Sequence, residues 1–244
     1  MRRFFAPSEN ISGKKITIAD NKQQHYIKDV LRIKAGQEVI VFDEKTNEYL
    51  CSVEKLKPAL ALNIKKIYPA CAIPRNMVLS LACAIPKKSS MDDIVDKLTQ
   101  LGVDRVIPLE TERTIVRLDK KKKELRLGHW RNVAQSASQQ SQRSSLPVIE
   151  PVQSVKEALS GAKGYDLKLI PTLEGERRSL KDVLRGSGAK NILVFIGPEG
   201  DFSPAEVELA KKSGCVAVSL GKEVLRVETA AVAVASYIKF LYQG

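Results

Sequence analysis

From Met77 onwards, short apolar runs alternate with segments of amphipathic helical pattern, and this alternation restricts the possible folds more than any other feature of the chain. The first run, Met77–Ile85, is apolar almost throughout, as in a strand buried on both faces of a sheet. After it, Ile94, Leu98 and Leu101 follow at intervals of four and three residues, which places them on one face of a helix. Alternating strands and helices are typical of a parallel α/β sheet, which binds ligands at the carboxyl ends of its strands.

The same pattern continues to the end of the chain and predicts an open, doubly wound sheet. Further strands are expected at residues 103–109, 167–170, 192–196 and 216–220. Further helices are expected at about 120–142, and at 179–184, 203–212 and 228–242.

The first seventy residues have a different pattern, in which short β-type runs are separated by turns. One helix is expected between Asp20, which can cap it, and Gly36, where it would end. Its buried face would hold Ile27, Val30 and Leu31. Strands are expected at residues 2–5, 37–43, 48–54 and 60–68.

The change of pattern marks a domain boundary, and Pro69 and Pro74 bracket it. We expect a β-rich domain over residues 1–70 and an α/β domain over residues 74–244. A hydrophobic content of 43% excludes general disorder. No apolar run reaches the roughly 18 residues of a membrane span, and the first ten residues lack the apolar core of a signal peptide, so we expect a cytoplasmic protein.

Cysteine and histidine are too few and too scattered for a metal or redox site. No CxxC pair occurs, and a zinc site needs ligands that are more numerous and more closely spaced. We therefore expect no metal, and four buried thiols. The residues concerned are Cys51, Cys71, Cys83, Cys215, His25 and His129.

The chain is basic, with 40 Lys and Arg against 28 Asp and Glu, a formal net charge of +12. Such an excess favours an anionic partner, with nucleic acid the first candidate. Charge alone is equally compatible with a surface that serves solubility.

The sharpest local motif is the segment Ile192–Glu206, which reads ILVFIGPEGDFSPAE. A buried strand ends at Gly197, a Pro-Glu-Gly turn follows, and a capping box at Ser203 opens a helix with proline in its first turn. Glycines here would let the backbone approach a ligand closely. The motif is neither a Walker loop nor GxGxxG, and a tight turn without a ligand remains an alternative.

Two further strands end in comparable loops. One loop runs from Leu220-Gly221 to Glu228 and Thr229 at the start of a helix, and the other spans Leu169–Gly175. Because the carboxyl ends of parallel strands lie at one edge of a sheet, we expect all three loops to converge on one pocket.

Together these motifs resemble the SPOUT methyltransferases, and more narrowly the family that makes N3-methyluridine at position 1498 of 16S ribosomal RNA. The resemblance rests first on Gly197-Pro198-Glu199-Gly200 and on Leu225–Ala230. It extends over nearly the whole chain in order and spacing. The other matching segments are Arg2–Phe5, Val30–Arg32, Lys97–Val103, Glu112-Arg113 and Gln140–Arg143.

The resemblance implies an amino-terminal PUA-like β-barrel, a carboxy-terminal domain with a trefoil knot, and a homodimer. It also implies S-adenosylmethionine (SAM) as cofactor and the 16S rRNA of the small ribosomal subunit as partner. Leu173 and Leu225 could instead be plain core residues. The cofactor-binding residues would be Leu173, Gly197, Pro198, Glu199, Gly200, Leu220, Gly221, Leu225 and Thr229.

The chain departs from the family pattern at several positions. Glu223-Val224 stands where an arginine-isoleucine pair is expected, and Gln139–Arg143 replaces the usual Glu-Gln-Ser-Gly-Arg. Asp201 occupies a position that is more often glycine. These departures bear more on RNA contacts than on methyl transfer.

Three residues are candidates for the chemistry. Arg226 could stabilise charge developing on a uracil oxygen or hold a phosphate; alternatively it forms an ion pair with Glu223 or Glu228. Glu199 could accept a hydrogen bond from cofactor or base, or cap its loop. Glu228 could accept the proton, or interact with the amides of its helix start.

Basic residues in both domains are candidates for phosphate contacts, which position RNA without reading its sequence. With one Trp, six Tyr and six Phe in the chain, few stacking platforms exist, so base discrimination is expected in a pocket for one splayed-out uridine. The RNA-binding candidates are Arg2, Arg3, Lys28, Arg32, Arg113 and Arg143.

Two other functions are compatible with parts of this pattern. A non-catalytic RNA-binding or ribosome-assembly protein could keep the fold without methyl transfer. A nucleotide-dependent oxidoreductase would need the dinucleotide fingerprint that the chain lacks.

Overall fold

The computed structural model describes residues 1–69, 77–87, 90–173 and 175–242. The expected linker at residues 70–74, with Cys71, lies outside this part of the chain. By their contacts the residues fall into two compact units, Met1–Pro74 with Ser138–Leu146, and Arg75–Ala137 with Pro147–Gly244. Segment 138–146, which the sequence assigned to the α/β domain, thus makes its contacts within the first unit.

The first unit contains a curled sheet with the strand order β1-β4-β5-β6-β3-β2. Strands β4, β5 and β6 form an antiparallel meander, while β1 pairs with β4 in parallel. The inward side chains of this sheet form one core, which includes Phe4, Ile16, Val41 and Leu62. The strands are β1 (Arg3–Phe5), β2 (Ile11–Ser12), β3 (Lys15–Ile18), β4 (Glu38–Phe42), β5 (Glu48–Lys55) and β6 (Leu60–Tyr68).

The helix of this unit is shorter than its sequence pattern predicts. Asp20 caps α1 (Asn21–His25), but the chain then forms a π-helix over Tyr26–Val30 and leaves the helical path well before Gly36. The amide of Leu31 donates to the carbonyl oxygen of Tyr26, five residues earlier, over 2.9 Å. Such widened turns break the 3.6-residue period, so Ile27 is buried whereas Val30 is 57% exposed. The prediction that Val30 faces the core was therefore wrong.

A buried carboxylate closes the turn between β4 and β5. Asp43 is 1% exposed, and its oxygens accept hydrogen bonds of 2.9 Å from the amides of Lys45 and Asn47, the Asn47 side chain and the Tyr49 hydroxyl. Burial, and next the hydrogen bond to Asp43, raise the pKa of Tyr49 to about 12. The Asp43 carboxylate thus organises the turn by accepting hydrogen bonds from three residues in and next to it.

We expect Asp43→Asn to lower the free energy of unfolding by about 2 kcal/mol, because an amide nitrogen would face donors that the carboxylate now accepts from. Urea denaturation of the two proteins measures the loss. Glu54→Gln, at an exposed ion pair with Lys15 on the same sheet, should cost less than about 0.5 kcal/mol. Equal losses for the two variants would contradict the role given to Asp43.

The second unit contains a sheet in which every described pairing is parallel, with the strand order β10-β8-β7-β13-β11-β14-β12 and β9 beside β8. The parallel α/β sheet predicted from the sequence is confirmed. Its main strands are β7 (Val78–Ala84), β8 (Arg105–Glu110), β11 (Leu167–Pro171), β13 (Asn191–Ile196) and β14 (Cys215–Ser219). Short strands β9 (Val148–Ile149), β10 (Gln153–Ser154) and β12 (Arg178–Ser179) extend it.

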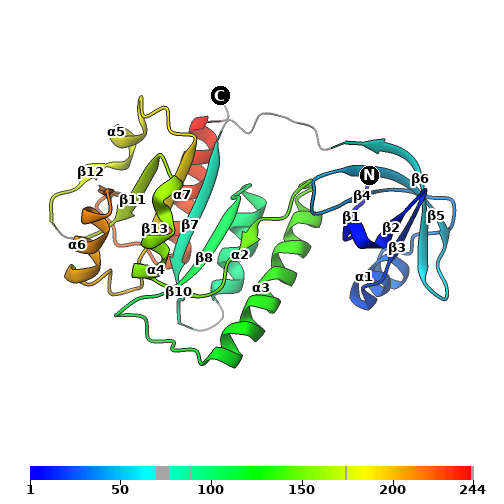
Figure 1. Ribbon diagram of the computed structural model, residues 1–244, viewed down its shortest axis with the longest axis horizontal. Coiled ribbons are helices and arrows are strands. Elements are labelled where there is room, and N and C mark those ends of the chain that lie inside the picture. The colour runs from blue at the N-terminus through cyan, green and yellow to red at the C-terminus, as the bar shows by residue number, and fades with distance from the viewer. Residues whose placement is uncertain (70–76, 88–89, 174, 243–244) are drawn as a thin grey trace. The chain divides into compact units, whose positions relative to one another are not determined.

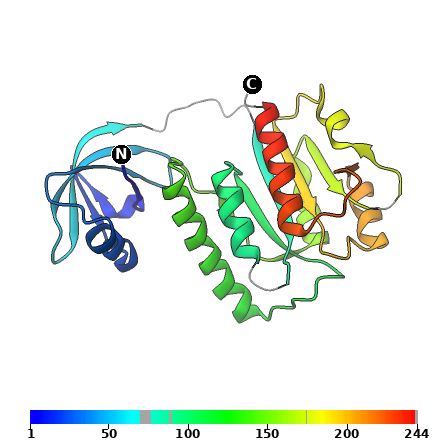
Figure 2. The same cartoon turned by 180° about the vertical axis from the view of Figure 1, so that it is seen from behind.

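Helices cover both faces of this sheet (Figures 1 and 2). Side chains alternate along β7, so that Leu79 and Leu81 join the cluster under α2 and α7, while Ala82 joins the cluster under α4 and α6. The helices are α2 (Ser90–Gln100), α3 (Lys120–Gln140), α4 (Val155–Ser160), α5 (Leu180–Leu184), α6 (Pro204–Lys212) and α7 (Val227–Tyr242), the last in red in the figures.

Candidate functional site

The candidate site is a pocket at the carboxyl ends of three neighbouring strands. Because β11 lies between β13 and β14, the loops that follow these strands come together, as the sequence predicted. The pocket encloses about 580 Å³ when the open solvent at its mouth is counted.

Most of the predicted cofactor residues line this pocket. They are Leu173, Gly197, Pro198, Glu199, Leu220, Gly221 and Leu225. Gly200, Thr229, Arg226 and Glu228 are described but are not among the lining residues. The pocket therefore collects the loops but not every residue predicted from them.

Two glycines in the pocket wall are required by their surroundings. A Cβ atom on Gly197 would lie 3.1 Å from two ring carbons of Phe202, which is 2% exposed and fixed in the core. Gly221 has a φ of +139°, a backbone conformation that L side chains rarely adopt. A larger residue would therefore press on Phe202 at position 197 and strain the backbone at position 221.

The chemistry of the wall fits SAM, which carries a cationic sulfonium, an amino acid group and an adenosine. Apolar side chains, among them Leu173 and Leu225, can hold a ring between them. The carboxylates of Glu199 and Glu223 and the guanidinium of Arg177 supply charges of both signs. One Glu199 oxygen accepts a hydrogen bond from the Lys87 amide at 3.4 Å.

Arg226 lies at the entrance to α7 with an exposed side chain. Its carbonyl oxygen accepts a hydrogen bond from the Ala230 amide at 2.8 Å, which fixes its backbone at the start of the helix. Within the described part of the chain, no ion pair joins Arg226 to Glu223 or Glu228. The ion pair with Glu223 or Glu228, which was the alternative to a catalytic role for Arg226, therefore does not form in this structure.

Polar contacts that the sequence did not predict connect the loops. Asp201 has a φ of +61°, and its carboxylate accepts hydrogen bonds from the Thr172 hydroxyl and the Leu173 amide. Thr172 and Arg177 also line the pocket. The sequence contained two signals for these contacts. Asp201 stands at a position that is more often glycine, and polar residues flank Leu173.

Arg113, predicted to contact RNA, adjoins the glycine loop. Its Nη1 donates to the carbonyl oxygen of Gly200 at 2.6 Å. The neighbouring Glu112 amide donates to Glu206 Oε1 at 2.9 Å, and buried Glu206 also accepts from the Ser203 amide in the predicted capping box. The segment after β8 is thus tied to the loop after β13.

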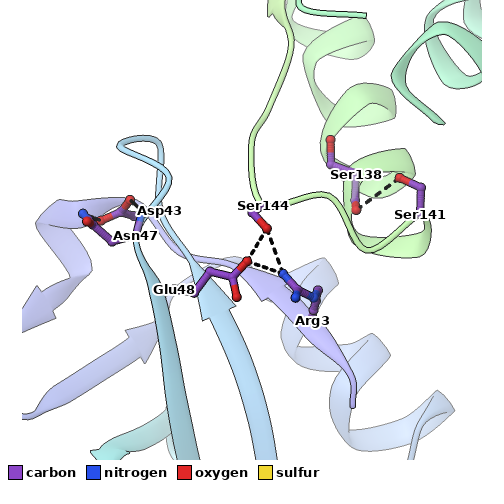
Figure 3. A network of polar contacts seen from close by, with 7 residues as sticks. All are labelled: Arg3, Asp43, Asn47, Glu48, Ser138, Ser141 and Ser144. Carbon is purple, nitrogen blue, oxygen red and sulfur yellow. Dashed lines mark hydrogen bonds and ion pairs between the residues drawn. The ribbon is translucent and has the colours of Figure 1, made fainter. Parts of the chain in front are cut away.

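In the first unit, Arg3 belongs to a polar network with Glu48 and Ser144 (Figure 3). Its Nη1 lies 2.5 Å from Glu48 Oε1 and 3.0 Å from the Ser144 hydroxyl, which itself donates to Glu48. The Arg3 and Glu48 side chains are 18% and 21% exposed. The network holds segment 138–146, with Arg143, against the sheet and gives Arg3 a structural task besides the predicted phosphate contact.

The pKa of Glu48 bears on stability in acid. Burial opposes its ionisation, but the hydrogen bonds from Arg3 and Ser144 and the charge of Arg3 outweigh burial and lower the pKa below its usual 4.5. A lowered folded-state pKa gives stability that is present above the unfolded-state value and is lost as the pH falls through the folded-state value.

We expect Glu48→Gln to weaken the dependence of the melting temperature on pH below about pH 4.5, because the variant has no carboxylate to protonate there. Thermal melts of both proteins from about pH 3 to about pH 7, a range that covers the titration of a glutamate, measure this difference. Parallel acid profiles for the two proteins would contradict the assignment.

The remaining RNA candidates are spread over the first unit. Lys28 donates through Nζ to Gln24 at 2.8 Å, Arg2 and Arg32 are exposed, and Arg32 has a φ of +51°. The Arg143 amide donates to the Ser138 carbonyl oxygen at 2.9 Å.

Three further findings concern the thiols, the metal-binding groups and the apolar helices of the described residues. Cys51, Cys83 and Cys215 are buried free thiols, and burial raises the pKa of Cys51 and Cys83 to about 12. No group of three His, Cys, Asp or Glu side chains that could hold a metal ion occurs among residues 1–69, 77–87, 90–173 and 175–242. No helix in the part described is long and apolar enough to cross a membrane.

Sequence profiles of two families match the chain. The RNA methyltransferase domain matches residues 74–239, and the RNA methyltransferase PUA domain matches residues 19–63. Among curated proteins, the ribosomal RNA small subunit methyltransferase E of Rickettsia conorii is 28% identical over 98% of this chain and 95% of its own. That of Bacillus subtilis is 26% identical over 96% of this chain and 91% of its own.

Solved structures give the same result. A ribosomal RNA small subunit methyltransferase E from Neisseria gonorrhoeae, bound to S-adenosyl methionine, is similar with a TM-score of 0.85 and 29% identity over 99% of this chain and 98% of its own. A Legionella pneumophila protein in complex with the cofactor SAM is similar with a TM-score of 0.88 and 28% identity over 98% of this chain and 97% of its own. The matched profile covers the sheet and all three pocket loops, and the chain therefore belongs to the RNA methyltransferase family.

Proposed function

We propose that this protein transfers a methyl group from SAM to N3 of the uridine at position 1498 of 16S ribosomal RNA in the small ribosomal subunit. The observation that carries the proposal is the pocket formed by the loops after β11, β13 and β14. The relatives named as small-subunit rRNA methyltransferases, one of them bound to S-adenosyl methionine, support this substrate and cofactor.

The pocket residues would bind and orient the cofactor. Leu173 and Leu225 would hold the adenine, the backbone at Gly197, Leu220 and Gly221 would approach the ligand closely, and Glu199 and Glu223 would favour its positive charge. When bound, SAM supplies a methyl group on a positively charged sulfur. Gly200, which lies beside Arg113, and Thr229, near the start of α7, complete the proposed cofactor set.

The remaining chemistry falls to side chains of this protein. N3 of uracil must lose its proton and approach the methyl carbon in line, so positioning contributes much of the rate. We assign Arg226 to the stabilisation of negative charge on the uracil oxygens. Glu199, which lines the pocket, is a better placed proton acceptor than Glu228, which lies outside the lining in the first turn of α7.

The two units have separate tasks in this proposal. Residues 1–70 would form a PUA-like β-barrel that contacts RNA through Arg2, Arg3, Lys28 and Arg32, as the curled sheet and the matched PUA profile suggest. Residues 74–244 would form a SPOUT domain with a trefoil knot. Arg113 and Arg143 would add phosphate contacts.

A homodimer is part of the same proposal. The outer face of α7 exposes Tyr237, Phe240 and Leu241, which are 38%, 71% and 43% exposed. Large apolar side chains grouped on one helix are typical of protein interfaces. A cytoplasmic location follows from the ribosomal substrate.

The experiment incubates the protein and labelled SAM with small ribosomal subunits, or their RNA, that lack the modification, and maps the methyl group by mass spectrometry. The expected result is a single methylated uridine at position 1498. SAM binding without methyl transfer to any uridine would contradict the proposal and favour a non-catalytic RNA-binding protein.

A further inference from the structure

Asp201 has a backbone conformation that glycine adopts more readily than any other residue. Its φ of +61° lies in the left-handed region, which costs an L residue free energy that glycine avoids. A residue retained in this conformation is usually compensated by specific contacts around it. The contacts of the Asp201 carboxylate therefore indicate the role of this residue.

The Asp201 carboxylate connects two of the three pocket loops. Oδ2 accepts hydrogen bonds from the Thr172 hydroxyl at 2.9 Å and from the Leu173 amide at 2.8 Å, both in the loop after β11. Oδ1 accepts from the Phe202 amide at 2.8 Å, within the loop after β13. A charged acceptor with donors on two loops fixes the distance between them.

Thr172 also continues the pairing of β11 with β14, the strand that leads into the third loop. It is 7% exposed, and its amide donates to the Val218 carbonyl oxygen at 3.2 Å, next to the carboxyl end of β14. Its own carbonyl oxygen accepts from Arg177 Nη1 at 2.8 Å, on the far side of the same loop. Thr172, Arg177 and Asp201 all line the pocket.

We propose that Asp201 and Thr172 form a clasp that holds the pocket loops after β11 and β13 in the arrangement that binds SAM, and that both are positioning residues for the cofactor. The inference rests on the proposed function, because it names SAM as the ligand. The clasp acts through the loops and requires no direct contact between Asp201 and the ligand.

The clasp would affect SAM affinity through the fraction of protein molecules whose loops are already assembled for binding. If the loops separate in the free protein, the apparent Kd rises in inverse proportion to the population that remains assembled. The Asp201 carboxylate favours the assembled state through its hydrogen bonds to both loops, and hydrogen bonds to charged groups are the stronger ones. Removing the carboxylate should therefore weaken cofactor binding and loosen the loops before any ligand is present.

The test compares Asp201→Gly, Asp201→Asn and Thr172→Val with the unchanged protein. Glycine at position 201 accepts the observed φ, so this variant removes the carboxylate without adding backbone strain. In Asp201→Gly we expect the Kd for SAM, measured by calorimetry, to rise at least about tenfold. Exchange of the Leu173 amide in the free protein should accelerate by a similar factor. Asp201→Asn keeps one acceptor oxygen, so its Kd for SAM and its Leu173 exchange rate should lie between those of the unchanged protein and those of Asp201→Gly.

Asp166→Gly is the matched control. Asp166 accepts hydrogen bonds of 2.8 Å from the amides of Lys190 and Asn191 and so joins β11 to β13 at their amino ends, away from the pocket. The control should lower the melting temperature and leave the Kd for SAM within about twofold.

The outcomes separate the clasp from the proposed function. An unchanged Kd and unchanged Leu173 exchange in Asp201→Gly would overturn the clasp, and so would an equal loss of SAM affinity in Asp166→Gly. If the unchanged protein binds no SAM, the proposed function fails together with the role of the clasp in cofactor binding. Leu173 exchange then still decides whether Asp201 holds the loops.

Discussion

Replacing Arg226 with alanine should lower the rate of methyl transfer about a hundred- to a thousandfold, the range observed when a group that stabilises developing charge is removed. The Kd for SAM should change less than about threefold, because Arg226 does not line the pocket. Its backbone is fixed by the hydrogen bond from Ala230, so the loss should be confined to the side chain. Single-turnover assays with labelled SAM and unmodified small subunits measure the rate.

Two controls accompany Arg226→Ala. Arg226→Lys keeps the charge but loses the planar fork of donors, and should recover part of the rate. Lys222→Ala removes an exposed cation from the same loop and should have little effect on the rate. A loss of folding or of SAM affinity in Arg226→Ala, with the rate at saturating SAM unchanged, would assign Arg226 a structural role instead.

Replacing Gly197 with valine should lower the free energy of unfolding by about 3 kcal/mol, because even a Cβ atom would lie 3.1 Å from the Phe202 ring. The displacement of Phe202 would shift the loop after β13, so the Kd for SAM should rise about a hundredfold. Urea denaturation and calorimetry measure the two effects.

Gly164→Val is the matched control, since a Cβ atom at Gly164 meets nothing within 4 Å. This variant should leave the Kd for SAM unchanged. If Gly197→Val binds SAM within about threefold of the unchanged protein, the close approach at Gly197 does not shape the pocket.

Local patterns in the sequence predicted the elements that bear the site. The apolar run that became β7 could only be buried on both faces, and the structure places helices on both sides of it. The capping box at Ser203 forms as predicted, because all of its partners lie within four residues. The helix after Asp20 was overestimated, because the sequence carries no local signal for the π-helix at Tyr26–Val30.

The candidate site was predictable in part for the same reason. Each glycine loop follows its own strand, so the loops could be found one at a time. That they meet depends on β11 lying between β13 and β14, which is a property of the sheet order. The link between Asp201 and Thr172 spans 29 residues, and that between Arg3 and Ser144 spans 141, so no spacing rule could have joined them.

The sequence alone thus determined the parallel α/β sheet, the three strand-end loops and the family resemblance, because each is written in residues that are close along the chain. The tertiary structure alone decided the strand order that brings these loops together, which side chains line the pocket and which are engaged elsewhere. The physical reason is that a carboxylate such as that of Asp201 finds its donors in space, where the order of the strands, and not the distance along the chain, sets what is near.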